Sequence, residues 1–412
     1  MNKAFKFRLY PTKEQEKTLF FTLNRCRELY NAALSERKDS YRYTGRGVTY
    51  YEQKRDLPEI KNIREEYNTI HSQVLQDVFA RLEKGMKAFF RRMKAGEKPG
   101  FPRFQGRNRY TSFTYTQMGT DKKGYSIGPS IREKRVHLPK IGAIKLKLHR
   151  PMQGTPKTCT IKYEVGQWYA TFSCEIPDEQ VVPTLPYTDE AIGVDLGLLH
   201  FATLSTGDTI ENPRYYRRAH ADLKRKQRKL SRCKPRSHRR EKARRQVAKA
   251  HRKIKNQRHD FLHKQSRQLV NTYEMIVFED LQVATISRAP KPKQDENGKF
   301  LPNGASKKAG LNKSILDAGW GHFVSLCQSK AEYAGCVTVL TVNPYKTSQV
   351  CSTCGREGEH KELSERTHTC VSCGVVLDRD HNAALNILRL GRSPQMPLVR
   401  AWQGPSVEAP AS

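Results

Sequence analysis

The chain has 412 residues, with 75 Lys and Arg against 41 Asp and Glu, and a formal net charge of +34 at pH 7. Two to four domains are expected at this length, and so large a positive charge predicts a polyanionic partner, most simply nucleic acid. No apolar run approaches the length of a membrane-spanning helix, and no basic helix carries a broad apolar face, so we expect a soluble, cytoplasmic protein without membrane contact.

The N-terminal part predicts a strand followed by helices. Residues 3–10 alternate between apolar and polar side chains, which is typical of a half-buried strand. Thr12 and Gln15 form a capping box that begins a helix, and apolar residues recur at helical spacing over residues 71–93. We therefore expect a helical domain over residues 12–104 with basic surfaces.

The next segment, residues 110–177, changes to a period of two. Strands are predicted at residues 112–116, 136–138, 144–148, 159–163 and 168–174. Short strands separated by Gly and Pro favour a small β-barrel. We expect the first strand to complete it, so that the barrel comprises residues 1–11 and 105–182 and carries the helical domain as an insertion.

Residues 214–258 are the most basic segment, with 21 Lys or Arg and two acids. Apolar residues recur at intervals of seven, at Leu223 and Leu230 and again at Val247, Ile254 and Phe261. This pattern predicts a helical hairpin that turns near Cys233. Charge of one sign at this density repels itself without a polyanion, so we expect a clamp on phosphates. The candidate phosphate contacts are Lys224, Arg225, Arg228, Arg240, Arg244, Arg245 and Arg252.

The C-terminal half alternates between apolar strands and helices. Residues 274–281 and 336–342 predict buried strands, and residues 314–334 predict a helix between them. Residues 288–313 are rich in Pro, Gly and Lys and predict a mobile loop. The tail, residues 393–412, is expected to be disordered.

Two Cys-x-x-Cys pairs lie near the C-terminal end, separated by fifteen residues: Cys351, Cys354, Cys370 and Cys373. This spacing is typical of a tetrahedral four-thiolate zinc site, which is closed and therefore structural. Disulfides fit poorly, because the N-terminus does not resemble a secretory signal and the other six cysteines are scattered. His360 and His368 lie within the predicted ribbon, and with four cysteines available we expect both on the surface.

Three acids complete the pattern. Asp195 lies in the apolar strand segment 191–197, Glu279 ends another, and Asp380 opens an Asn/Ala-rich helix. Asp195 alone is also compatible with a solvent-facing position on an edge strand. Together, in a strongly basic chain, the three favour an RNase H-like nuclease whose carboxylates hold two Mg²⁺ or Mn²⁺ ions about 4 Å apart.

The chain resembles TnpB, the transposon-encoded RNA-guided nuclease family related to type V CRISPR effectors, over nearly its whole length. The motifs that carry the resemblance are residues 3–11, Gly100-Phe-Pro-Arg-Phe104, Gly193-Val-Asp-Leu-Gly197, Asp317-Ala-Gly-Trp-Gly321, the two cysteine pairs and residues 378–387. The resemblance implies an α/β multidomain protein: a RuvC-like nuclease with a zinc-ribbon insertion, and a wedge β-barrel carrying a helical recognition domain. It assigns residues 187–345 and 376–392 to the nuclease, including a basic hairpin over 213–270, and residues 346–375 to the ribbon.

The resemblance also implies roles for residues and partners. Asp195, Glu279 and Asp380 match the family's metal ligands, and Asp378 is better interpreted as structural. A guide RNA from the transposon end would direct one protein copy to double-stranded DNA, which is cut beside a short transposon-adjacent motif. By position, residues that read this motif in related proteins match Tyr50, Gln76 and Thr114.

Three alternatives remain at this stage. A transposase that joins strands can use the same acidic fold. A guided DNA-binding repressor would have lost nuclease activity, yet all three acids are present here. A zinc-ribbon RNA-binding protein would explain the charge and cysteines but would leave Asp195 and Glu279 without a role.

Overall fold

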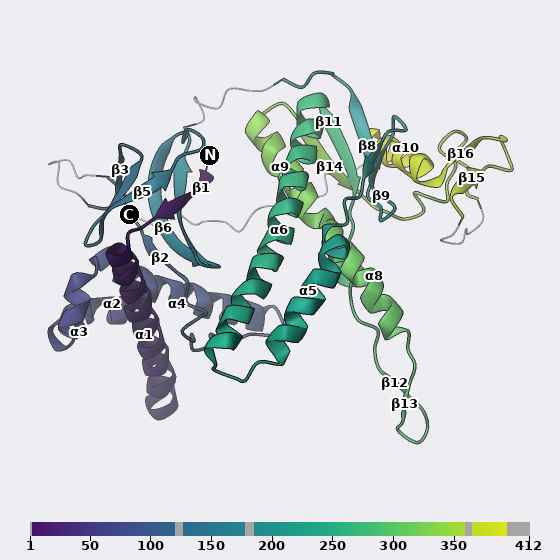
Figure 1. Cartoon of the computed structure of the whole chain (residues 1–412). Helices are drawn as coiled ribbons and strands as arrows, with labels where there is room; N and C mark the ends of the chain where they lie inside the picture. Colours follow the sequence, from purple (N-terminus) through teal and green to yellow (C-terminus); the bar gives the residue numbers. More distant parts are fainter. Residues whose placement is uncertain (1, 120–126, 178–184, 359–364, 394–412) are drawn as a thin grey trace. The chain divides into compact units, whose positions relative to one another are not determined.

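The computed structural model describes residues 2–119, 127–177, 185–358 and 365–393 (Figure 1). The chain forms two compact units, Met1–Gln180 and Val181–Ser412. Within the described ranges, no helix combines the length and the apolarity needed to cross a membrane. The predicted disordered tail lies outside the described residues from position 394 onward.

The first unit is built on a seven-stranded antiparallel sheet with the strand order β2-β6-β7-β1-β5-β4-β3. Its strands are β1 (Asn2–Tyr10), β2 (Ser112–Tyr115), β3 (Ser130–Arg132), β4 (Arg135–Leu138), β5 (Gly142–Lys147), β6 (Thr155–Glu164) and β7 (Gln167–Glu175). The prediction that the first strand joins the later ones is confirmed, because β1 pairs with both β5 and β7. Beyond the strands, the backbone N–H of Gly119 donates to the carbonyl of Pro129 at 3.0 Å, which brings the two edges of the sheet together.

Helices occupy the segment between β1 and β2. They are α1 (Lys13–Thr44), α2 (Tyr50–Arg55), α3 (Leu57–Ile63), the 3₁₀ helix η1 (Glu65–Thr69) and α4 (Ser72–Lys94). The predicted capping box of Thr12 and Gln15 is present at the start of α1. This helix continues to Gly45, whose φ of 69° ends it in the left-handed conformation that glycine tolerates.

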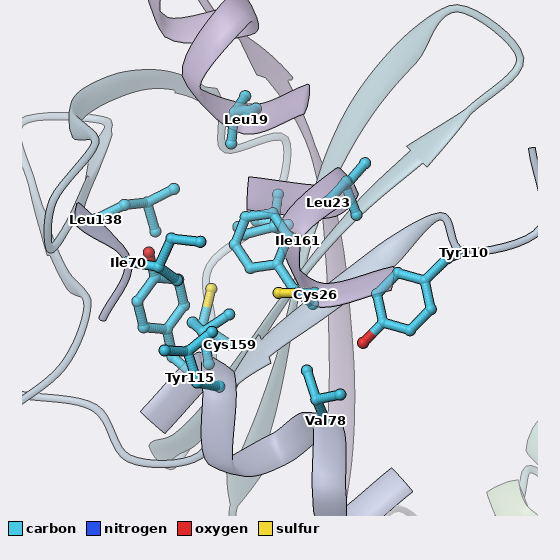
Figure 2. Close-up of a cluster of buried hydrophobic side chains, with 14 of the residues drawn as sticks. Leu19, Leu23, Cys26, Ile70, Val78, Tyr110, Tyr115, Leu138, Cys159 and Ile161 are labelled. Carbon is cyan, nitrogen blue, oxygen red and sulfur yellow. The ribbon is translucent and has the colours of Figure 1, made fainter. Parts of the chain in front are cut away.

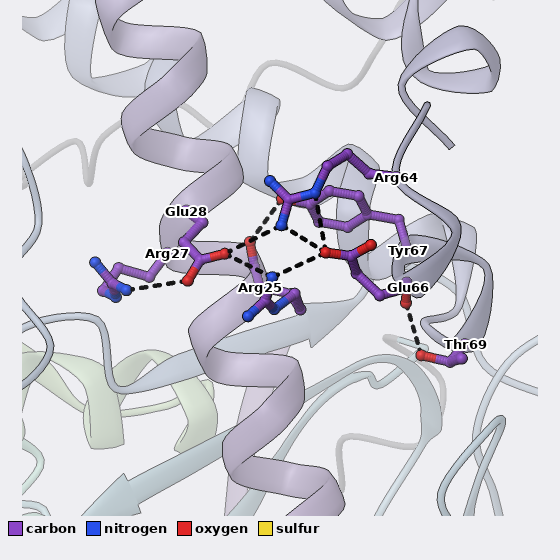
Figure 3. Close-up of polar contacts among 7 residues, drawn as sticks. All are labelled: Arg25, Arg27, Glu28, Arg64, Glu66, Tyr67 and Thr69. Carbon is purple, nitrogen blue, oxygen red and sulfur yellow. Dashed lines mark hydrogen bonds and ion pairs between the residues drawn. The ribbon is translucent and has the colours of Figure 1, made fainter. Parts of the chain in front are cut away.

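A network of ion pairs ties α1 to η1 (Figure 3). Arg25 Nη1 lies 2.9 Å from Glu28 Oε2 and 3.0 Å from Glu66 Oε1. Arg64 reaches the same two carboxylates, and its guanidinium donates to Glu66. The shared charges fix η1 against the helix, although pairs this exposed contribute little each to stability.

The core of the first unit lies between α1, α4 and the sheet (Figure 2). Leu19, Leu23 and Cys26 of α1 meet Val78 of α4 and strand residues such as Ile161. Burial raises the pKa of Cys26 to about 12, so its thiol is a neutral packing group.

The second unit contains a five-stranded mixed sheet with the order β10-β9-β8-β11-β14. Its strands are β8 (Ala191–Asp195), β9 (His200–Leu204), β10 (Thr209–Glu211), β11 (Met275–Glu279) and β14 (Thr338–Val342). Strand β11 is parallel to β8 and to β14, whereas β9 runs antiparallel to β8. Two hairpins lie outside this sheet, β12 (Lys293–Gln294) with β13 (Phe300–Leu301), and β15 (Thr367–Thr369) with β16 (Val376–Asp378).

The helices of this unit cover both faces of the sheet. They are α5 (Tyr215–Ser231), α6 (His238–Thr272), α7 (Val283–Ile286), α8 (Ala305–Ala318), α9 (Trp320–Ala334) and α10 (Arg379–Arg392). On β11, Ile276 and Phe278 pack in one buried cluster with α6 and α9, whereas Val277 packs in another with Ile387 of α10. Alternation along the strand therefore places α6 and α9 on one face and α10 on the other (Figure 1).

Two predictions for this unit were wrong in part. The expected loop over residues 288–313 ends early, because α8 begins at Ala305 and the β12–β13 hairpin precedes it. The expected single helix over 314–334 is two helices, since Gly319 adopts a φ of 75° between α8 and α9. A left-handed residue interrupts the helical backbone without changing the apolar periodicity, so the pattern alone could not show the break.

Candidate active site and metal centre

Asp195 and Glu279 lie at the same edge of the sheet, where two neighbouring strands end. Asp195 is the last residue of β8 and Glu279 is the last residue of β11, its parallel neighbour. Side chains alternate along a strand, so Glu279 faces the side of Val277, the side that α10 covers. By the same alternation, Asp195 faces the side of Gly193.

Gly193 brings α10 close to the sheet. A Cβ atom at this position would lie 2.1 Å from the carbonyl oxygen of Ala384, a distance that no side chain tolerates. A Cβ on Gly391, one of the last residues of α10, would likewise lie 2.5 Å from Val277. Because both glycines allow close packing, the first turn of α10 carries Asp380 toward the ends of β8 and β11.

The charges of Glu279 and Asp380 both act on Asp195. Burial raises the pKa of Asp195 well above its ordinary value, and the negative charges of Glu279 and Asp380 raise it further. Burial also raises the pKa of Glu279, against a hydrogen bond from Thr347 that lowers it. Burial raises the pKa of Asp380, while Arg366 lowers it. The site therefore has an excess of negative charge and only oxygen ligands, which fits hard divalent cations.

Residues that sequence reasoning did not single out hold Glu279 in place. The Oγ1 of Thr347 donates a hydrogen bond to Glu279 Oε1. Asn386 Nδ2 donates to the carbonyls of Thr347 at 2.9 Å and Val350 at 2.7 Å, and Asn382 Nδ2 donates to Val350 at 2.8 Å. The two buried asparagines lie one helical turn apart, and that spacing was the available signal in the sequence.

The surroundings of Asp380 separate it from its neighbour Asp378. The Asp378 carboxylate is the N-cap of α10 and accepts hydrogen bonds from the backbone N–H groups of Asp380 at 2.9 Å and His381 at 3.1 Å. The structural role predicted for Asp378 is thus confirmed. Arg366 Nη1 lies 3.5 Å from Asp380 Oδ2, so a positive charge lies beside the Asp380 carboxylate.

The four cysteines form a metal-ligand cluster. Cys351 Sγ lies 3.7 Å from Cys373 Sγ, Cys354 Sγ lies 3.5 Å from Cys370 Sγ, and all four sulfurs lie within 4.8 Å of one another. A tetrahedral zinc with bonds of about 2.3 Å holds its sulfurs about 3.8 Å apart. Of the described residues, only these four form a group of three or more ligand atoms within that limit, so the carboxylates are spaced more widely.

Each cysteine pair is a turn closed by a glycine. The backbone N–H of Gly355 donates to Cys351 O, and that of Gly374 to Cys370 O, both at 2.9 Å. Their φ values of 75° and 73° favour glycine, and the two turns have matching geometry. Backbone N–H groups, chiefly that of Cys373, lower the pKa of Cys370 to about 6, which favours the thiolate that zinc binds.

One histidine prediction was wrong. His368 was expected on the surface, but only 1% of it is exposed. It lies in β15, where alternation directs its ring inward and close to Gly358. His360 lies outside the described residues.

The predicted basic hairpin is confirmed. Helices α5 and α6 pack side by side, and the chain turns between Ser231 and His238. Leu223 and Ile254 of the predicted seam are buried between them. The remaining seam positions are partly exposed, as in a narrow helical interface.

The candidate phosphate contacts on the hairpin differ in how far their side chains are exposed to solvent and in the partners they already have. The exposed ones are Lys224, Arg225, Arg228, Arg244 and Arg245. Arg225 pairs with Asp222 and Arg245 with Glu241, each at 2.8 Å and on the same helix. Arg240 instead donates to the carbonyls of Leu230 and Cys233, so it holds the turn, and Arg252 is partly buried.

Two of the three candidate motif readers, Tyr50 and Thr114, lie near one ion pair of the first unit. Thr114 Oγ1 accepts a hydrogen bond from Arg81 Nη2 at 2.7 Å, and Arg81 Nε donates to Asp77 at 2.6 Å. Gln76 precedes Asp77 on α4 and is partly buried. Burial raises the pKa of Tyr50, and the charge of Asp77 also contributes. Thr114 therefore contacts the Arg81–Asp77 ion pair and Tyr50 lies within charge interaction of Asp77, whereas Gln76 is only the neighbour of Asp77 in the sequence.

Family models match three parts of the chain. One described as "Probable transposase" matches residues 171–289, one described as "Cas12f1-like, TNB domain" matches residues 320–387, and one described as "Helix-turn-helix domain" matches residues 1–46. The last of these segments folds here as a strand and a single long helix, β1 and α1.

Solved structures of CRISPR effectors also align with the chain. A Cas12f1–sgRNA–target DNA complex covers 94% of this chain and 99% of its own, at 14% identity and a TM-score of 0.32. The mini-RNA-guided endonuclease CRISPR-Cas_phi3 covers 95% of this chain and 92% of its own, at 12% identity and a TM-score of 0.37. Both scores are too low for a shared fold to follow from them.

Curated relatives show the family. A protein of Streptomyces pristinaespiralis named "Putative RNA-guided DNA endonuclease" is 32% identical over 95% of this chain and 90% of its own length. InsQ of Escherichia coli, which carries the same description, is 32% identical over 95% of this chain and 92% of its own. A TnpB-like protein of Acanthamoeba polyphaga mimivirus is 28% identical over 61% of this chain and 46% of its own. With two relatives at this identity over nearly its full length, the chain belongs to the TnpB family of RNA-guided DNA endonucleases.

Proposed function

We propose that this protein is a metal-dependent, RNA-guided endonuclease that cuts double-stranded DNA beside a short transposon-adjacent motif. The observation that carries the proposal is the convergence of Asp195, Glu279 and Asp380 on the α10 face of the mixed sheet. The relatives named as RNA-guided DNA endonucleases supply the class of reaction.

The carboxylates fit two Mg²⁺ or Mn²⁺ ions. Burial raises the pKa of Asp195, and the negative charges of Glu279 and Asp380 contribute to the same shift. Bound divalent ions would activate water and stabilise the leaving oxygen of the phosphodiester. The chain itself orients the ligands: Thr347 fixes one oxygen of Glu279, and the N-cap Asp378 fixes the turn that presents Asp380.

We assign parts of the chain to domains as the resemblance implies. A wedge barrel would comprise residues 1–11 and 105–182, and the helical recognition domain residues 12–104. The nuclease would comprise residues 187–345 and 376–392, with a zinc ribbon at 346–375. A seven-stranded sheet whose edges approach each other supports the first assignment, and parallel strands ending in acids support the nuclease.

The partners of the proposed enzyme are a guide RNA and target DNA. Exposed cations on α5 and α6, among them Lys224, Arg228 and Arg244, are suited to the phosphate backbone. Tyr50, Gln76 and Thr114 would read the adjacent motif, and Thr114 is held by a hydrogen bond from Arg81. One zinc ion would be held by the four cysteines and would have a structural role.

The test is cleavage of a plasmid library by the protein purified with RNA co-expressed from its own locus. The library carries a guide-matched target beside randomised flanks and is incubated with Mg²⁺. We expect cutting only at matched targets with one flank, loss of cutting in Asp195→Ala, and full cutting in the matched control Asp189→Asn, an exposed acid of the same unit.

Other outcomes would identify other functions. Guide-dependent binding by the wild type without cutting would indicate a DNA-binding repressor. Joining of DNA ends without a guide would indicate a transposase. RNA binding with neither DNA binding nor cutting would leave only an RNA-binding protein.

A further inference from the structure

A hollow between α6 and α9 lies outside the residues discussed above. It measures about 510 Å³ and is lined by His263, Lys264, Arg267, Gln268, Asn271 and Lys330. The first five come from α6 and the last from α9, which pack side by side (Figure 1). None of the lining residues is acidic, and all of them can donate hydrogen bonds.

Lys330 is held at the wall of this hollow by neutral acceptors. Its Nζ donates to the carbonyl of His263 at 2.5 Å and to Ser266 Oγ at 2.7 Å. Ser266 is fully buried, so the ammonium group has a fixed position and not a free surface one. No carboxylate pairs with Lys330 among the described residues. A half-buried ammonium without a counter-charge is unfavourable in the free protein.

A second cation faces the same place. Burial, and to a lesser extent the positive charge of Arg267, lowers the pKa of Lys330 to about 8. Arg267 is exposed and forms no ion pair with any described acid. Lys264, by contrast, pairs with Asp260 at 2.8 Å. Two cations that repel each other beside an open hollow are stabilised when an anion binds between them.

The donors also have a linear arrangement. Lys264, Arg267, Gln268 and Asn271 are spaced by three, four and seven residues, so they lie on one face of α6. Seven residues of helix extend about 10 Å, which is long enough for more than one phosphate. The amide groups of Gln268 and Asn271 donate to phosphate or sugar oxygens, as side-chain amides do at nucleic-acid backbones.

We propose that this hollow is a binding site for a nucleic-acid phosphodiester backbone, with Lys330 and Arg267 as its central contacts. The proposal rests on the proposed function, since it adds a second backbone site to a nucleic-acid enzyme. It places the contact at the C-terminal part of α6, beyond the most basic segment, residues 214–258.

The test measures binding of dye-labelled 20-nucleotide RNA and DNA of one sequence to the full-length chain, freed of nucleic acid, over a series of salt concentrations. Arg267→Gln changes an exposed side chain, and Lys330→Met removes the ammonium but keeps the chain length. Lys307→Gln, an exposed lysine of α8, is the matched control.

We expect each hollow variant to weaken binding about 3- to 10-fold at low salt and to reduce the salt slope by about 0.7 per lost phosphate contact. Lys307→Gln should change neither. Gln268→Glu, which places a carboxylate in the hollow, should weaken binding more than Arg267→Gln. Equal losses of affinity for RNA and DNA would show that the hollow contacts only phosphates. A larger loss of affinity for RNA would show that it also contacts the ribose 2′-hydroxyl.

Unchanged affinity and unchanged salt slope in Arg267→Gln and Gln268→Glu would overturn this site. If the same variants still cut guided targets, the proposed function would stand without it. Failure of the wild type to bind either strand would overturn both.

Discussion

At the residue scale, a first prediction follows from the excess of negative charge around Asp195. Burial and two neighbouring acids raise the pKa of Asp195, so its carboxylate is unfavourable in the folded chain without cations. Asp195→Asn should therefore raise the melting temperature of the Mg²⁺-free protein by a few degrees, at about 2–4 °C per kcal/mol. Mg²⁺ should raise the melting temperature of the wild type and leave that of the variant unchanged.

Calorimetry after dialysis checks this, because a chelator would also remove zinc. Asp189→Asn, an exposed acid of the same unit, should behave as the wild type in both conditions. A variant that melts below the wild type without Mg²⁺ would show that Asp195 stabilises the fold through contacts of its own.

Thr347 carries the second prediction at this scale. Its hydroxyl donates to Glu279 Oε1 and 5% of the residue is exposed, so the contact is fixed by packing. Thr347→Val keeps the shape and removes the donor, and we expect single-turnover cleavage to fall about 10-fold, equivalent to about 1.4 kcal/mol. Thr347→Ser should retain most of the rate. Equal losses in both variants would indicate packing and not the hydrogen bond.

The sequence predicted the acids but not the residues that support them. Asp195, Glu279 and Asp380 are visible because an acid at the end of an apolar strand or in a helix N-terminal turn is unusual. Thr347 is an ordinary residue of a loop, and its partner Glu279 lies 68 positions away. A contact of that kind depends on tertiary structure, so no local pattern indicates it.

At the element scale, the packing of α10 on β8 depends on one missing side chain. Gly193→Ala would place a Cβ 2.1 Å from the carbonyl oxygen of Ala384, and backbone cannot give way as a side chain can. We expect a loss of about 3 kcal/mol in unfolding free energy and a loss of cleavage, because Asp380 moves with the helix. Gly310→Ala, on α8 with no heavy atom within 4 Å of the new Cβ, should be neutral or stabilising.

Denaturant unfolding and the cleavage assay together check this. Full activity in Gly193→Ala would show that α10 can shift without moving Asp380. The same contact explains why Gly-Val-Asp occurs at this strand, a motif that sequence alone identified without its reason.

Another prediction at this scale concerns the four-cysteine group and the neighbouring segment that supports Glu279. Cys370→Ser should lower bound zinc from one ion per chain to none, measured by elemental analysis. The segment from Thr347 to Val350 lies between this group and α10, so the support of Glu279 should weaken and cleavage should fall. Cys233→Ser, in the turn between α5 and α6, should leave zinc and activity unchanged. Zinc retained in Cys370→Ser would contradict the four-ligand assignment.

Elements were predictable where periodicity was strong. The alternation of residues 3–10 and the seven-residue spacing of the basic segment both gave the correct elements. The break at Gly319 was missed, because glycine inside an apolar helical pattern is usually tolerated. His368 was expected on the surface because it is polar. It is buried because it lies in a short strand, where alternation and not polarity decides which side a residue faces.

At the scale of the whole molecule, the order of helices and strands along the chain was predictable from the sequence. Which strands share a sheet was harder to predict, because it depends on pairing between distant segments. Strand β1 pairs with β7 across some 160 residues, and only the structure shows that register. The helices between β1 and β2 pack into the same core as the sheet, so the expected insertion contributes to one cluster of buried residues. Composition predicted a polyanionic partner without any structure, because net charge does not depend on topology.

The division into two units makes the last prediction, for the full-length chain. The buried clusters of Met1–Gln180 and Val181–Ser412 share no residues, so each unit should unfold cooperatively by itself. Leu82 and Leu262 are fully buried, one in each unit, and replacing either with Ala costs about 2–5 kcal/mol. Calorimetry should therefore show two transitions, with Leu82→Ala lowering one and Leu262→Ala the other, each by about 5–15 °C. If both variants lower a single transition equally, the two units unfold as one and not independently.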